Sequence, residues 1–456
     1  MNAYLNRYVD QFRLRARIRF GTRIVSIAKD DPKDATIPWL VKCEASDGHI
    51  ETCQFDLVII ATGLFSEPYI APIVGQEKFT GPIVHPCDVK TQADLTDRRV
   101  VIIGAGKCAT DMAVLAGKFA RTCHLVFRRA HWAFPRAIMN GTVSFRYLLS
   151  RALHMPFSPF PTGPHTSLFR FLHRAVPQLF TKITDGISAD FIGTLGPDLF
   201  DDRVFIPRTS MRNAENLSLI PDEFIPLKRQ GRIVGKLAAV TAVIDGTTVE
   251  LDSGEQLHAD MIISATGFTV RFPFFSEALA HALGLPTEPT VEPILNLYRG
   301  ILPVGIPNIA FIGFVSSLCN FMYDEVASHW VSDSFLGRLD LPATERAMHD
   351  EIRTRRAFVR AAFHREAFQI GFYWIASIDA MLQDMGLRMY RTNNWISEYC
   401  TVYRPNRFKD LHEERRAKAS GKAMHRWYFG FRETILVVIV LLFFLWKFFA
   451  SKYPSV

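Results

Sequence analysis

The amino-acid sequence predicts an α/β protein built around parallel strands, and three observations carry this prediction. The stretch "VVIIGAGKCATDMA", which begins at Val100, has the pattern of a buried strand, a glycine turn and a helix. Two other apolar strands, "DLVIIATG" and "DMIISATG", both end on Ala-Thr-Gly. Helical periodicity follows from about residue 323 to 390. Strands that alternate with helices in this way favour a parallel sheet.

Composition and charge limit the class of protein. At 456 residues, the chain is long enough for two or three domains with sizeable cores. Hydrophobic residues make up 48% of the chain and charged residues 21%, which excludes a disordered protein. The formal charge of +8 suits an anionic cofactor or an anionic membrane face. Because no arginine-rich array or nucleic-acid motif accompanies that charge, we predict no nucleic-acid partner.

The seven cysteines are scattered along the chain. None forms a Cys-x-x-Cys pair, and no cysteine and histidine residues have the spacing of a zinc site. We therefore predict reduced thiols in a cytosol-like compartment and no metal site. The first twenty residues lack the apolar core of a secretory signal.

Residues 17–63 alternate apolar and polar residues, which predicts β-structure. Asp47-Gly48 has the composition of a hairpin turn within this segment. The segment closes on a buried strand that ends at Ala61, Thr62 and Gly63. A linker rich in proline and glycine leads from there to the strand that begins near Val100.

The glycine turn after that strand has the chemistry of a pyrophosphate site. Gly104 permits the tight turn, and Gly106 allows the backbone to approach a phosphate closely. Ala109 provides the small residue that packs the helix on the strand. The unpaired N–H groups and positive dipole end of the helix then face the ligand. We predict that residues 104–109 (Gly104, Ala105, Gly106, Lys107, Cys108 and Ala109) bind a dinucleotide.

The residues after the second strand suggest which dinucleotide is bound. In a site for NAD or FAD, an acid about 20 residues past the first glycine holds the ribose hydroxyls. Here the strand "CHLVF" ends in Arg128 and Arg129. A guanidinium group pairs with a 2′-phosphate, often through two contacts, whereas an acid would repel it. The prediction is an NADP(H) site, and the alternative is that two arginines merely end an exposed strand.

Residues 135–230 are rich in proline and phenylalanine with weak periodicity, which predicts an insertion of irregular segments and short helices. Short strands separated by Asp/Gly turns then return, and they lead to a buried strand that ends at Ala265, Thr266 and Gly267.

The C-terminus has a different composition. An apolar run from Ile435 to Trp446 follows a basic segment. With its aromatic approach and a snorkelling Lys447, this run reaches the length of roughly 20 residues that a membrane span needs. The basic side chains ahead of it favour the cytosolic side of a membrane. We expect a membrane anchor, and the alternative is a buried terminal helix.

Taken together, these motifs resemble the flavin-containing monooxygenases, in which an NADPH domain interrupts an FAD domain. The identifying signature of that family, F-x-G-x-x-x-H-x-x-x-(Y/F), matches at Phe79, Gly81 and His85 and departs at Val89. The glycine turn is similar to the family's turn, with Cys108 in place of its usual serine. His85 also has the alternative of being only a surface residue of a proline-flanked loop.

Three later segments also resemble the family. "FRRAHWAFPR" matches its arginine-then-tryptophan segment, whereas "LYRGILPVGIPNIAFIGF" and "DEVASHW" resemble its return into the FAD domain. Glu325 and Trp330 lie within the last of these, where packing is the simpler role. The resemblance implies that the two Ala-Thr-Gly segments mark the crossings between the domains. It makes Ala61, Thr62, Gly63, Thr266 and Gly267 cofactor-binding residues.

The resemblance implies two interleaved dinucleotide-binding (Rossmann-like) domains, the first incomplete, plus a C-terminal hydrophobic helix. The expected domains are 1–95, a remnant of the FAD-type domain with a linker; 96–270, the NADPH-binding domain with its insertion; 271–412, the return to the FAD-type domain with a mainly helical end; 413–432, a basic linker; and 433–450, the membrane anchor.

Members of the family begin with a G-x-G-x-x-G unit for FAD, and no such motif precedes Gly104 in this sequence. Either the sequence is an incomplete version of a normal enzyme, or a shortened protein holds flavin differently or does no flavin chemistry. In both cases we expect the strands that end at Gly63 and Gly267 to lack a neighbour. An unpaired edge and an uncovered apolar face would remain.

The resemblance implies an enzyme that uses FAD and NADP as cofactors to transfer one oxygen atom from O₂ to a small molecule. The acceptor is a soft nucleophile (an amine or a sulfide) or a ketone.

No Ser/His/Asp arrangement or paired carboxylates mark a catalytic side chain, so the catalytic residues stay unknown. The main alternative is a membrane-tethered NADP(H)-binding protein without oxygenase activity. An N-hydroxylase or a disulfide-reductase-like flavoprotein is a third hypothesis, and the absence of Cys-x-x-Cys disfavours the latter. Microsomal members place the anchor in the endoplasmic reticulum, with the catalytic part in the cytosol.

Overall fold

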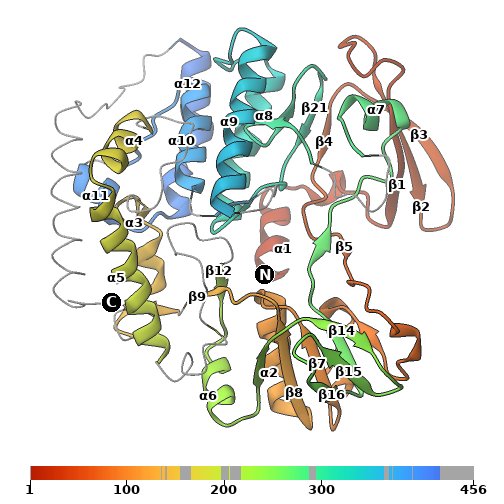
Figure 1. Cartoon of the computed structure of the whole chain (residues 1–456). Helices are drawn as coiled ribbons and strands as arrows, with labels where there is room; N and C mark the ends of the chain where they lie inside the picture. Colours follow the sequence, from red (N-terminus) through yellow and green to blue (C-terminus); the bar gives the residue numbers. More distant parts are fainter. Residues whose placement is uncertain are drawn as a thin grey trace. The chain divides into compact units, whose positions relative to one another are not determined.

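The computed structural model describes residues 2–134, 136–138, 141–154, 166–196, 205, 217–286, 294–363, 369–371, 373–392 and 394–421. The chain divides into two compact units (Figure 1): residues 1–61 with 271–311, and residues 62–270 with 312–456. The chain therefore leaves the first unit within the first Ala-Thr-Gly segment and returns to it shortly after the second one.

The first unit is mostly β-structure. Its described elements are α1 (Asn2–Gln11), η1 (Arg15–Arg17), β1 (Thr22–Ala28), β2 (Trp39–Ala45), β3 (Ile50–Phe55), β4 (Val58–Ile60), α7 (Glu277–Ala282), β19 (Leu297–Tyr298), β20 (Leu302–Pro303) and β21 (Ile309–Phe311). Strands β1, β2 and β3 form an antiparallel sheet in that order. Alternation along β2 buries Trp39, Val41 and Cys43 on one face. The turn at Asp47-Gly48 is confirmed, because Gly48 adopts a φ of 84° between β2 and β3.

Strand β4 pairs in parallel with β21, which comes from the far end of the first unit. Ile59 in the middle of β4 is 48% exposed, an unusual value for isoleucine in a strand of this composition. One apolar side chain of β4 is therefore uncovered, and the larger uncovered face that the sequence predicts beside Gly63 stays a prediction.

The second unit contains a sheet of parallel strands in the order β13-β8-β7-β17-β6. Its strands are β6 (Ile83–Val84), β7 (Arg99–Ile103), β8 (Thr122–Phe127), β13 (Val234–Leu237) and β17 (Met261–Ser264). Strand β17, which leads to Gly267, lies between β7 and β6. The expectation that this strand lacks a neighbour is therefore wrong. The signature segment itself supplies the missing partner as β6.

Both faces of this parallel sheet are covered (Figure 1). Helix α2 (Lys107–Phe119) covers one face, where its Ala109 and Ala113 pack against Val100 and Ile102. Residues of β14 (Val240–Val243), β15 (Thr248–Leu251) and β16 (Gln256–His258) pack against Val101 on the other face. This alternation of side chains along β7 explains why its sequence is a continuous apolar run.

The remaining elements of the second unit are mostly short strands and helices. They are β5 (Glu67–Pro68), η2 (Gln76–Lys78), η3 (Pro86–Asp88), η4 (Gln92–Asp94), β9 (Trp132–Phe134), β10 (Ala137–Ile138), β11 (Val143–Ser144), η5 (Phe145–Leu148), α3 (Arg151–His154), α4 (Thr166–Ala175), α5 (Pro177–Leu195), β12 (Leu217–Leu219), α6 (Phe224–Arg229), β18 (Phe268–Thr269), β22 (Ser316–Ser317), α8 (Asn320–Phe335), α9 (Glu345–Phe363), β23 (Gln369–Gly371), α10 (Trp374–Asp384), α11 (Trp395–Cys400), η8 (Pro405–Phe408) and α12 (Leu411–Ala419).

Two helical predictions have different outcomes. The helical character of residues 323–390 is confirmed by α8, α9 and α10. In residues 135–230, by contrast, α5 is 19 residues long, so the expectation of only short helices there is wrong. Its buried residues, which include Phe180, Ile187 and Phe191, stabilise the helix by packing. Because the periodicity of this segment is weak, its sequence alone does not predict a long helix.

The predicted basic linker (413–432) is described only as far as residue 421, and the predicted anchor (433–450) lies outside the described residues. Among the helices of the described ranges, none combines the length and the apolar character that a membrane crossing requires.

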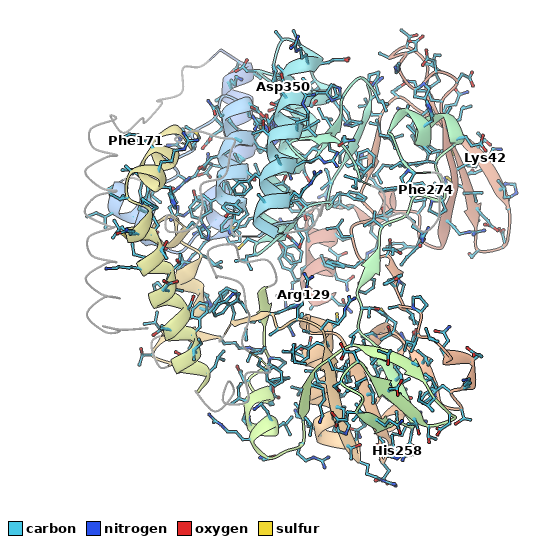
Figure 2. All side chains as sticks on the ribbon, in the orientation of Figure 1. Lys42, Arg129, Phe171, His258, Phe274 and Asp350 are labelled. Carbon is cyan, nitrogen blue, oxygen red and sulfur yellow. The ribbon has the colours of Figure 1, made fainter. Side chains whose placement is uncertain are left out.

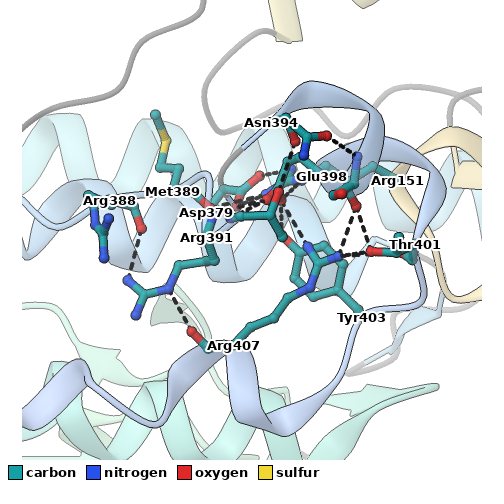
Figure 3. Close-up of polar contacts among 12 residues, drawn as sticks. Arg151, Asp379, Arg388, Met389, Arg391, Asn394, Glu398, Thr401, Tyr403 and Arg407 are labelled. Atoms are coloured by element: carbon teal, nitrogen blue, oxygen red, sulfur yellow. Dashed lines mark hydrogen bonds and ion pairs between the residues drawn. The ribbon is translucent and has the colours of Figure 1, made fainter.

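A buried ionic cluster joins the insertion to the C-terminal helices of the second unit (Figure 3). Arg151, at the start of α3, donates to Asp379 Oδ1 of α10 at 2.7 Å and to Glu398 Oε1 of α11 at 2.9 Å. Arg407 donates to the same Glu398 oxygen at 3.1 Å, and the Tyr403 hydroxyl does so at 3.0 Å. Glu398 has no exposed side-chain surface. Two guanidinium groups thus face two carboxylates out of water.

The electrostatics of this cluster are visible in the ionisation of Glu398. Burial alone would raise its pKa, but the nearby Arg151 and Arg407 outweigh burial and hold the pKa below its usual value. Each charge in the cluster is compensated, so the loss of one partner leaves another buried and unpaired. The packing of α3 against α10 and α11 therefore depends on Arg151, which pairs with a carboxylate on each of these two helices.

We expect Arg151→Met to lower the free energy of unfolding by about 3–5 kcal/mol, because Asp379 and Glu398 lose their shared partner. Urea denaturation at pH 7, followed by circular dichroism, measures this loss. The difference from the wild type should shrink below about pH 4.3, the unfolded pKa of glutamate, because Glu398 becomes protonated as the pH falls through its lowered folded pKa.

Arg353→Met is the matched control for this variant. Arg353 pairs with Asp350 on the surface of α9, where both side chains are more than half exposed. Its removal should cost less than about 1 kcal/mol. Equal losses for the two variants would contradict a special role for the buried cluster.

Candidate functional site

The candidate site lies where β7 and β17 end side by side in the parallel sheet. In the sheet, β8 and then β13 lie on one side of β7, whereas β17 and then β6 lie on its other side. Such a reversal of strand order leaves a crevice outside the carboxyl ends of the two central strands, where α/β proteins bind their ligands. Gly104 follows β7 at this point, and Ala265 follows β17.

The two glycines of the turn have different structural roles. Gly104 adopts a φ of 133°, and a Cβ there would lie 2.4 Å from the backbone oxygen of Ala265. Its N–H donates to the Val126 carbonyl at 2.9 Å, which holds the turn against the end of β8. Gly106 is the N-cap of α2 without a side-chain cap, and a Cβ there would meet no atom within 4 Å. Open space thus faces the N-terminal N–H groups of α2.

The electrostatics at this helix end suit an anion. The first turn of α2 contains no acidic residue. Lys107 forms an ion pair with Asp111 in the next turn, which neutralises that carboxylate. Burial is the main cause that raises the pKa of Cys108, so its thiol is neutral at physiological pH and does not repel a phosphate. The turn therefore combines a positive dipole end with no opposing charge.

Arg128 and Arg129 lie at the same edge of the sheet as the turn. Strands β7 and β8 are parallel, and Ile103 pairs with Val126 in their register. The residues that follow each strand, Gly104 and Arg128, therefore emerge at one edge. Both arginines are exposed, and Figure 2 marks Arg129 at this end of the strands. The structure thus brings together the glycine turn and the arginine pair that the sequence singled out.

The second Ala-Thr-Gly segment is held by hydrogen bonds to residues that follow the first one. The Thr266 hydroxyl donates to the Tyr69 carbonyl and accepts from the Ala71 N–H at 3.3 Å. Next to it, β18 pairs antiparallel with β5. Two backbone stretches almost 200 residues apart in sequence are therefore joined beside the sheet edge.

His85 is part of the same arrangement and is not a surface residue. The residue is 1% exposed, and its Nε2 lies 2.9 Å from the Gly267 carbonyl oxygen. Because a carbonyl only accepts, Nε2 carries the proton, and Nδ1 accepts the Cys87 N–H at 3.3 Å. His85 thus fixes the conformation of Gly267, which has a φ of 99°.

The other signature residues also act through packing. A Cβ on Gly81 would lie 2.2 Å from the Asp260 oxygen, so only glycine allows β6 to approach β17. Phe79 packs on the β14–β16 side of the sheet, and Val89 packs on the α2 side. The departure at Val89 therefore replaces an aromatic ring with a smaller apolar side chain at a packed position.

A second group of residues gathers at the first Ala-Thr-Gly segment. Gly63 and Gly313 lie close together, with φ values of 72° and 83°. The Gly313 N–H is close enough to the Asp324 carboxylate, near the start of α8, to favour its charged form. The Oδ1 atom of that carboxylate is buried and has no hydrogen-bond partner among the described residues. Burial raises the pKa of Asp324 to about 6, against the opposing effect of the Gly313 N–H.

Sequence reasoning missed Asp324 and Gly313, although it quoted the segments that contain them. It considered the next residue, Glu325, which is exposed. The prediction that Trp330 packs is confirmed, because it is fully buried and its Nε1 donates to Asp384 at 3.1 Å. An aspartate in a helical segment usually faces solvent, so the sequence gives no sign that Asp324 is buried.

The flavin-binding monooxygenase-like family matches residues 1–162 and 211–390, which is most of the chain. The chain belongs to this family. Flavin-binding monooxygenase-like proteins use FAD and NADP, and the class of enzyme that the sequence predicted, a flavin-dependent monooxygenase, is confirmed.

Several relatives of this family cover most of the chain. FAD-dependent monooxygenase rstn6 of Aspergillus nomiae is 26% identical over 90% of this chain and 83% of the relative. Probable flavin-containing monooxygenase 1 of Arabidopsis thaliana is 23% identical over 90% of this chain and 82% of the relative.

Solved structures of monooxygenases share the fold. Oxidized steroid monooxygenase bound to NADP aligns at 18% identity with a TM-score of 0.57, over 84% of this chain and 82% of that one. S-allyl-L-cysteine S-oxygenase from Allium sativum aligns at 16% identity with a TM-score of 0.54, over 99% of this chain and 76% of that one. These alignments confirm the α/β fold with a parallel sheet.

The residues at the sheet edge fit NADP. The space beside Gly106 is bounded by backbone N–H groups, and exposed guanidinium groups lie at the same edge. These groups match the charges of a pyrophosphate and of an additional phosphate on a ribose.

The residues near Gly63 fit part of a flavin nucleotide. Two glycines without side chains leave the backbone accessible, and the buried Asp324 Oδ1 is an acceptor in need of a donor. A cofactor with hydroxyl and N–H groups supplies such donors. The fit of a flavin nucleotide therefore depends on Gly63, Gly313 and Asp324, all of the second unit.

The two glycines of the turn allow a sharp test of the NADP site. We expect Gly106→Val to lower the free energy of unfolding by no more than about 1 kcal/mol, since valine is a poor N-cap, and to weaken NADP⁺ binding at least about tenfold, because the new side chain occupies the space in front of α2. Calorimetric titration with NADP⁺ and thermal unfolding measure the two effects.

Gly104→Ala is the matched variant with the opposite expectation. Its Cβ would meet the Ala265 oxygen at 2.4 Å, and its backbone conformation alone costs about 1–3 kcal/mol. It should lower the melting temperature. Unchanged NADP⁺ affinity in folded Gly106→Val protein would contradict the assignment of the turn.

Proposed function

We propose that this protein is an NADPH- and FAD-dependent monooxygenase that transfers one oxygen atom from O₂ to a small organic molecule. The observation that carries the proposal is the meeting of three features at one sheet edge. They are the turn at Gly104–Gly106, the uncapped N-terminus of α2, and the pair Arg128 and Arg129. Membership of the flavin-binding monooxygenase-like family supports the flavin part of the proposal.

In this proposal the residues at the turn hold NADPH. The N–H groups of Lys107 and Cys108 lie in the first turn of α2 and face the pyrophosphate. Ala105 is small enough to let the nucleotide approach the backbone, and Ala109 packs α2 against β7. Arg128 or Arg129 binds the 2′-phosphate, because a planar guanidinium pairs with phosphate oxygens through two hydrogen bonds.

The residues near the two Ala-Thr-Gly segments hold the flavin and align the nicotinamide with it. Thr62 and Gly63 contact the flavin nucleotide, and Asp324 accepts a hydrogen bond through its unpartnered Oδ1. Thr266 and Gly267 are fixed by Tyr69 and His85, so they define one wall for the nicotinamide. Bound FAD supplies the redox chemistry, accepting hydride from NADPH and activating O₂. The protein's part is to bind, to orient and to exclude water.

The substrate class in this proposal is a soft nucleophile, an amine or a sulfide, or else a ketone. Relatives and structural neighbours are named for chemistry of both kinds, including S-oxygenation and the oxygenation of cyclohexanone. No side chain of the described residues is required as a nucleophile in this mechanism. Assays of oxygen transfer to a tertiary amine, a thioether and a cyclic ketone distinguish the branches.

The experiment that tests the coenzyme assignment is the double variant Arg128→Ala/Arg129→Ala. Loss of charge-assisted contacts to the 2′-phosphate should cost about 1.5–3 kcal/mol, which is about 10- to 150-fold in NADPH affinity. The affinity for NADH should stay nearly unchanged, because NADH lacks that phosphate. Flavin reduction at varied coenzyme concentration measures both.

The double variant Arg98→Ala/Arg121→Ala is the control, since it removes the same charge at the amino ends of β7 and β8. It should leave the preference for NADPH intact. Equal loss of NADPH and NADH affinity in the Arg128/Arg129 variant would refute the 2′-phosphate role.

We further propose that the C-terminal segment tethers the protein to an intracellular membrane, with its catalytic part on the cytosolic side. The support is the apolar run Ile435–Trp446 and the basic side chains ahead of it, namely Arg416, Lys418, Lys422, Arg426 and Arg432. Arg415 of the same segment pairs with the buried Asp333 and adds nothing to this support. The endoplasmic reticulum is the membrane we expect.

Removal of the residues after Arg432 should move the protein from the membrane fraction to the supernatant, because the apolar run is the part that inserts into lipid. Fractionation after a carbonate wash measures this. Truncated protein that still binds NADP⁺ and still pellets with membranes would argue against the tether.

A further inference from the structure

Two cysteines and a glutamate gather on one face of the β1-β2-β3 sheet in the first unit. The thiol sulfurs of Cys43 and Cys53 and a carboxylate oxygen of Glu51 all lie within 4.8 Å of one another. Cys43 is buried, whereas Cys53 and Glu51 are partly exposed. Neither the coenzyme site nor the signature segment involves these residues. Two thiols and a carboxylate are ligands that zinc and similar metals accept.

The strand register explains how these side chains meet. Cys43 of β2 lies directly opposite Glu51 of β3, and Val41 lies opposite Cys53. The two cysteines are therefore diagonal neighbours on the same face of the hairpin. They come from different strands, so their separation in sequence has none of the regular spacing of a zinc motif. Spacing along the sequence therefore gives no sign that these residues lie together.

Diagonal placement favours a metal over a disulfide. The Cα atoms of diagonal cross-strand neighbours are about 7–8 Å apart, whereas a disulfide requires Cα atoms about 4.4–6.8 Å apart. Two thiolates on a tetrahedral zinc ion, each about 2.3 Å from the metal, are roughly 3.8 Å apart. The observed limit of 4.8 Å between ligand atoms is close to that spacing. A metal ion can thus join the strands without moving their backbones.

Arg19 covers this cluster in the structure. It forms an ion pair with Glu51, and its Nη1 lies 3.9 Å from the Cys53 sulfur. The Glu51 carboxylate therefore already faces a positive charge at this position. The Arg19 side chain is 56% exposed, and it can swing into solvent at little cost. The Arg19 guanidinium group therefore neutralises Glu51 at the place that a metal cation would occupy.

We propose that Cys43, Glu51 and Cys53 bind one thiophilic divalent metal ion such as Zn²⁺, with water as the fourth ligand and Arg19 displaced into solvent. Binding releases the protons of the two thiols to solvent and forms two metal–sulfur bonds and one metal–oxygen bond. The ion joins β3, the edge strand of this sheet, to β2. Metal binding should therefore stabilise the first unit.

The pH dependence of binding follows from the thiols. A cysteine binds a metal ion as its thiolate, so Cys43 and Cys53 must lose their protons to the solvent when the metal binds. The charged groups that face Cys43 are Arg19, Glu51 and Cys53 on its own side of the sheet. Affinity should rise with pH as proton release becomes easier.

Titration of the reduced full-length protein with Co²⁺ tests the proposal, because thiolate-bound cobalt has intense ultraviolet and visible absorption that reports tetrahedral coordination. We expect one Co²⁺ per chain, displaced by Zn²⁺. The Cys43→Ser/Cys53→Ser variant should lose this absorption, and Zn²⁺ should raise the melting temperature of the wild type but not of this variant. The Cys400→Ser variant, which alters an exposed cysteine outside both this cluster and the coenzyme site, should keep both effects.

Arg19→Ala provides an independent measurement that leaves the sheet intact. Removal of the competing guanidinium group should tighten Co²⁺ binding by about tenfold, and Glu51→Gln should weaken it. The proposal is overturned if no cobalt–thiolate absorption forms, if it persists in Cys43→Ser/Cys53→Ser, or if Arg19→Ala weakens binding. A Cys43–Cys53 disulfide that forms in place of metal binding under mild oxidation, with no cobalt band in reductant, would also overturn it.

Discussion

The backbone of Gly104 lies so close to the carbonyl oxygen of Ala265 that a Cβ atom would come within 2.4 Å of it. This approach is possible only with glycine, and it holds the end of β7 against the end of β17. The glycine turn and the second Ala-Thr-Gly segment, more than 150 residues apart in sequence, therefore share one sheet edge. This contact sets where β7 ends beside β17, and so it sets the place of the crevice at the reversal of strand order. The N-terminus of α2 and the exposed arginines lie at the same edge.

The signature segment supports that edge from the other side. Gly81 lets β6 approach β17, and His85 donates its Nε2–H to the Gly267 carbonyl. A buried histidine in this role is a positioning residue: it sets the conformation of the backbone at Gly267, just after the end of β17. This explains why a sequence signature can identify a family although its residues need not contact the reacting atoms, and why Val89 is acceptable at a position that needs only apolar packing.

Charge is distributed unevenly over the chain, and each arrangement has a separate physical role. Where β7 and β8 end, the guanidinium groups are exposed and the first turn of α2 has no acid, so an anion meets little competition. In the Arg151 cluster the charges are buried and mutually compensated, which ties the insertion to the C-terminal helices. Beside Cys43 and Cys53, the partly exposed Arg19 balances the Glu51 carboxylate, and this is the place of the proposed metal ion.

The sequence by itself determined the α/β class, the hairpin at Asp47-Gly48, the strand–turn–helix unit at Gly104 and its partner arginines. These features are local: each depends on periodicity, turn chemistry or a helix end within a few residues. Only the tertiary structure decided that β6 pairs with β17, that His85 is buried, that Asp324 has an unpartnered oxygen, and that Cys43 and Cys53 are diagonal neighbours. The physical reason is that strand order, register and burial depend on contacts between residues far apart in sequence, and a local pattern has no information about them.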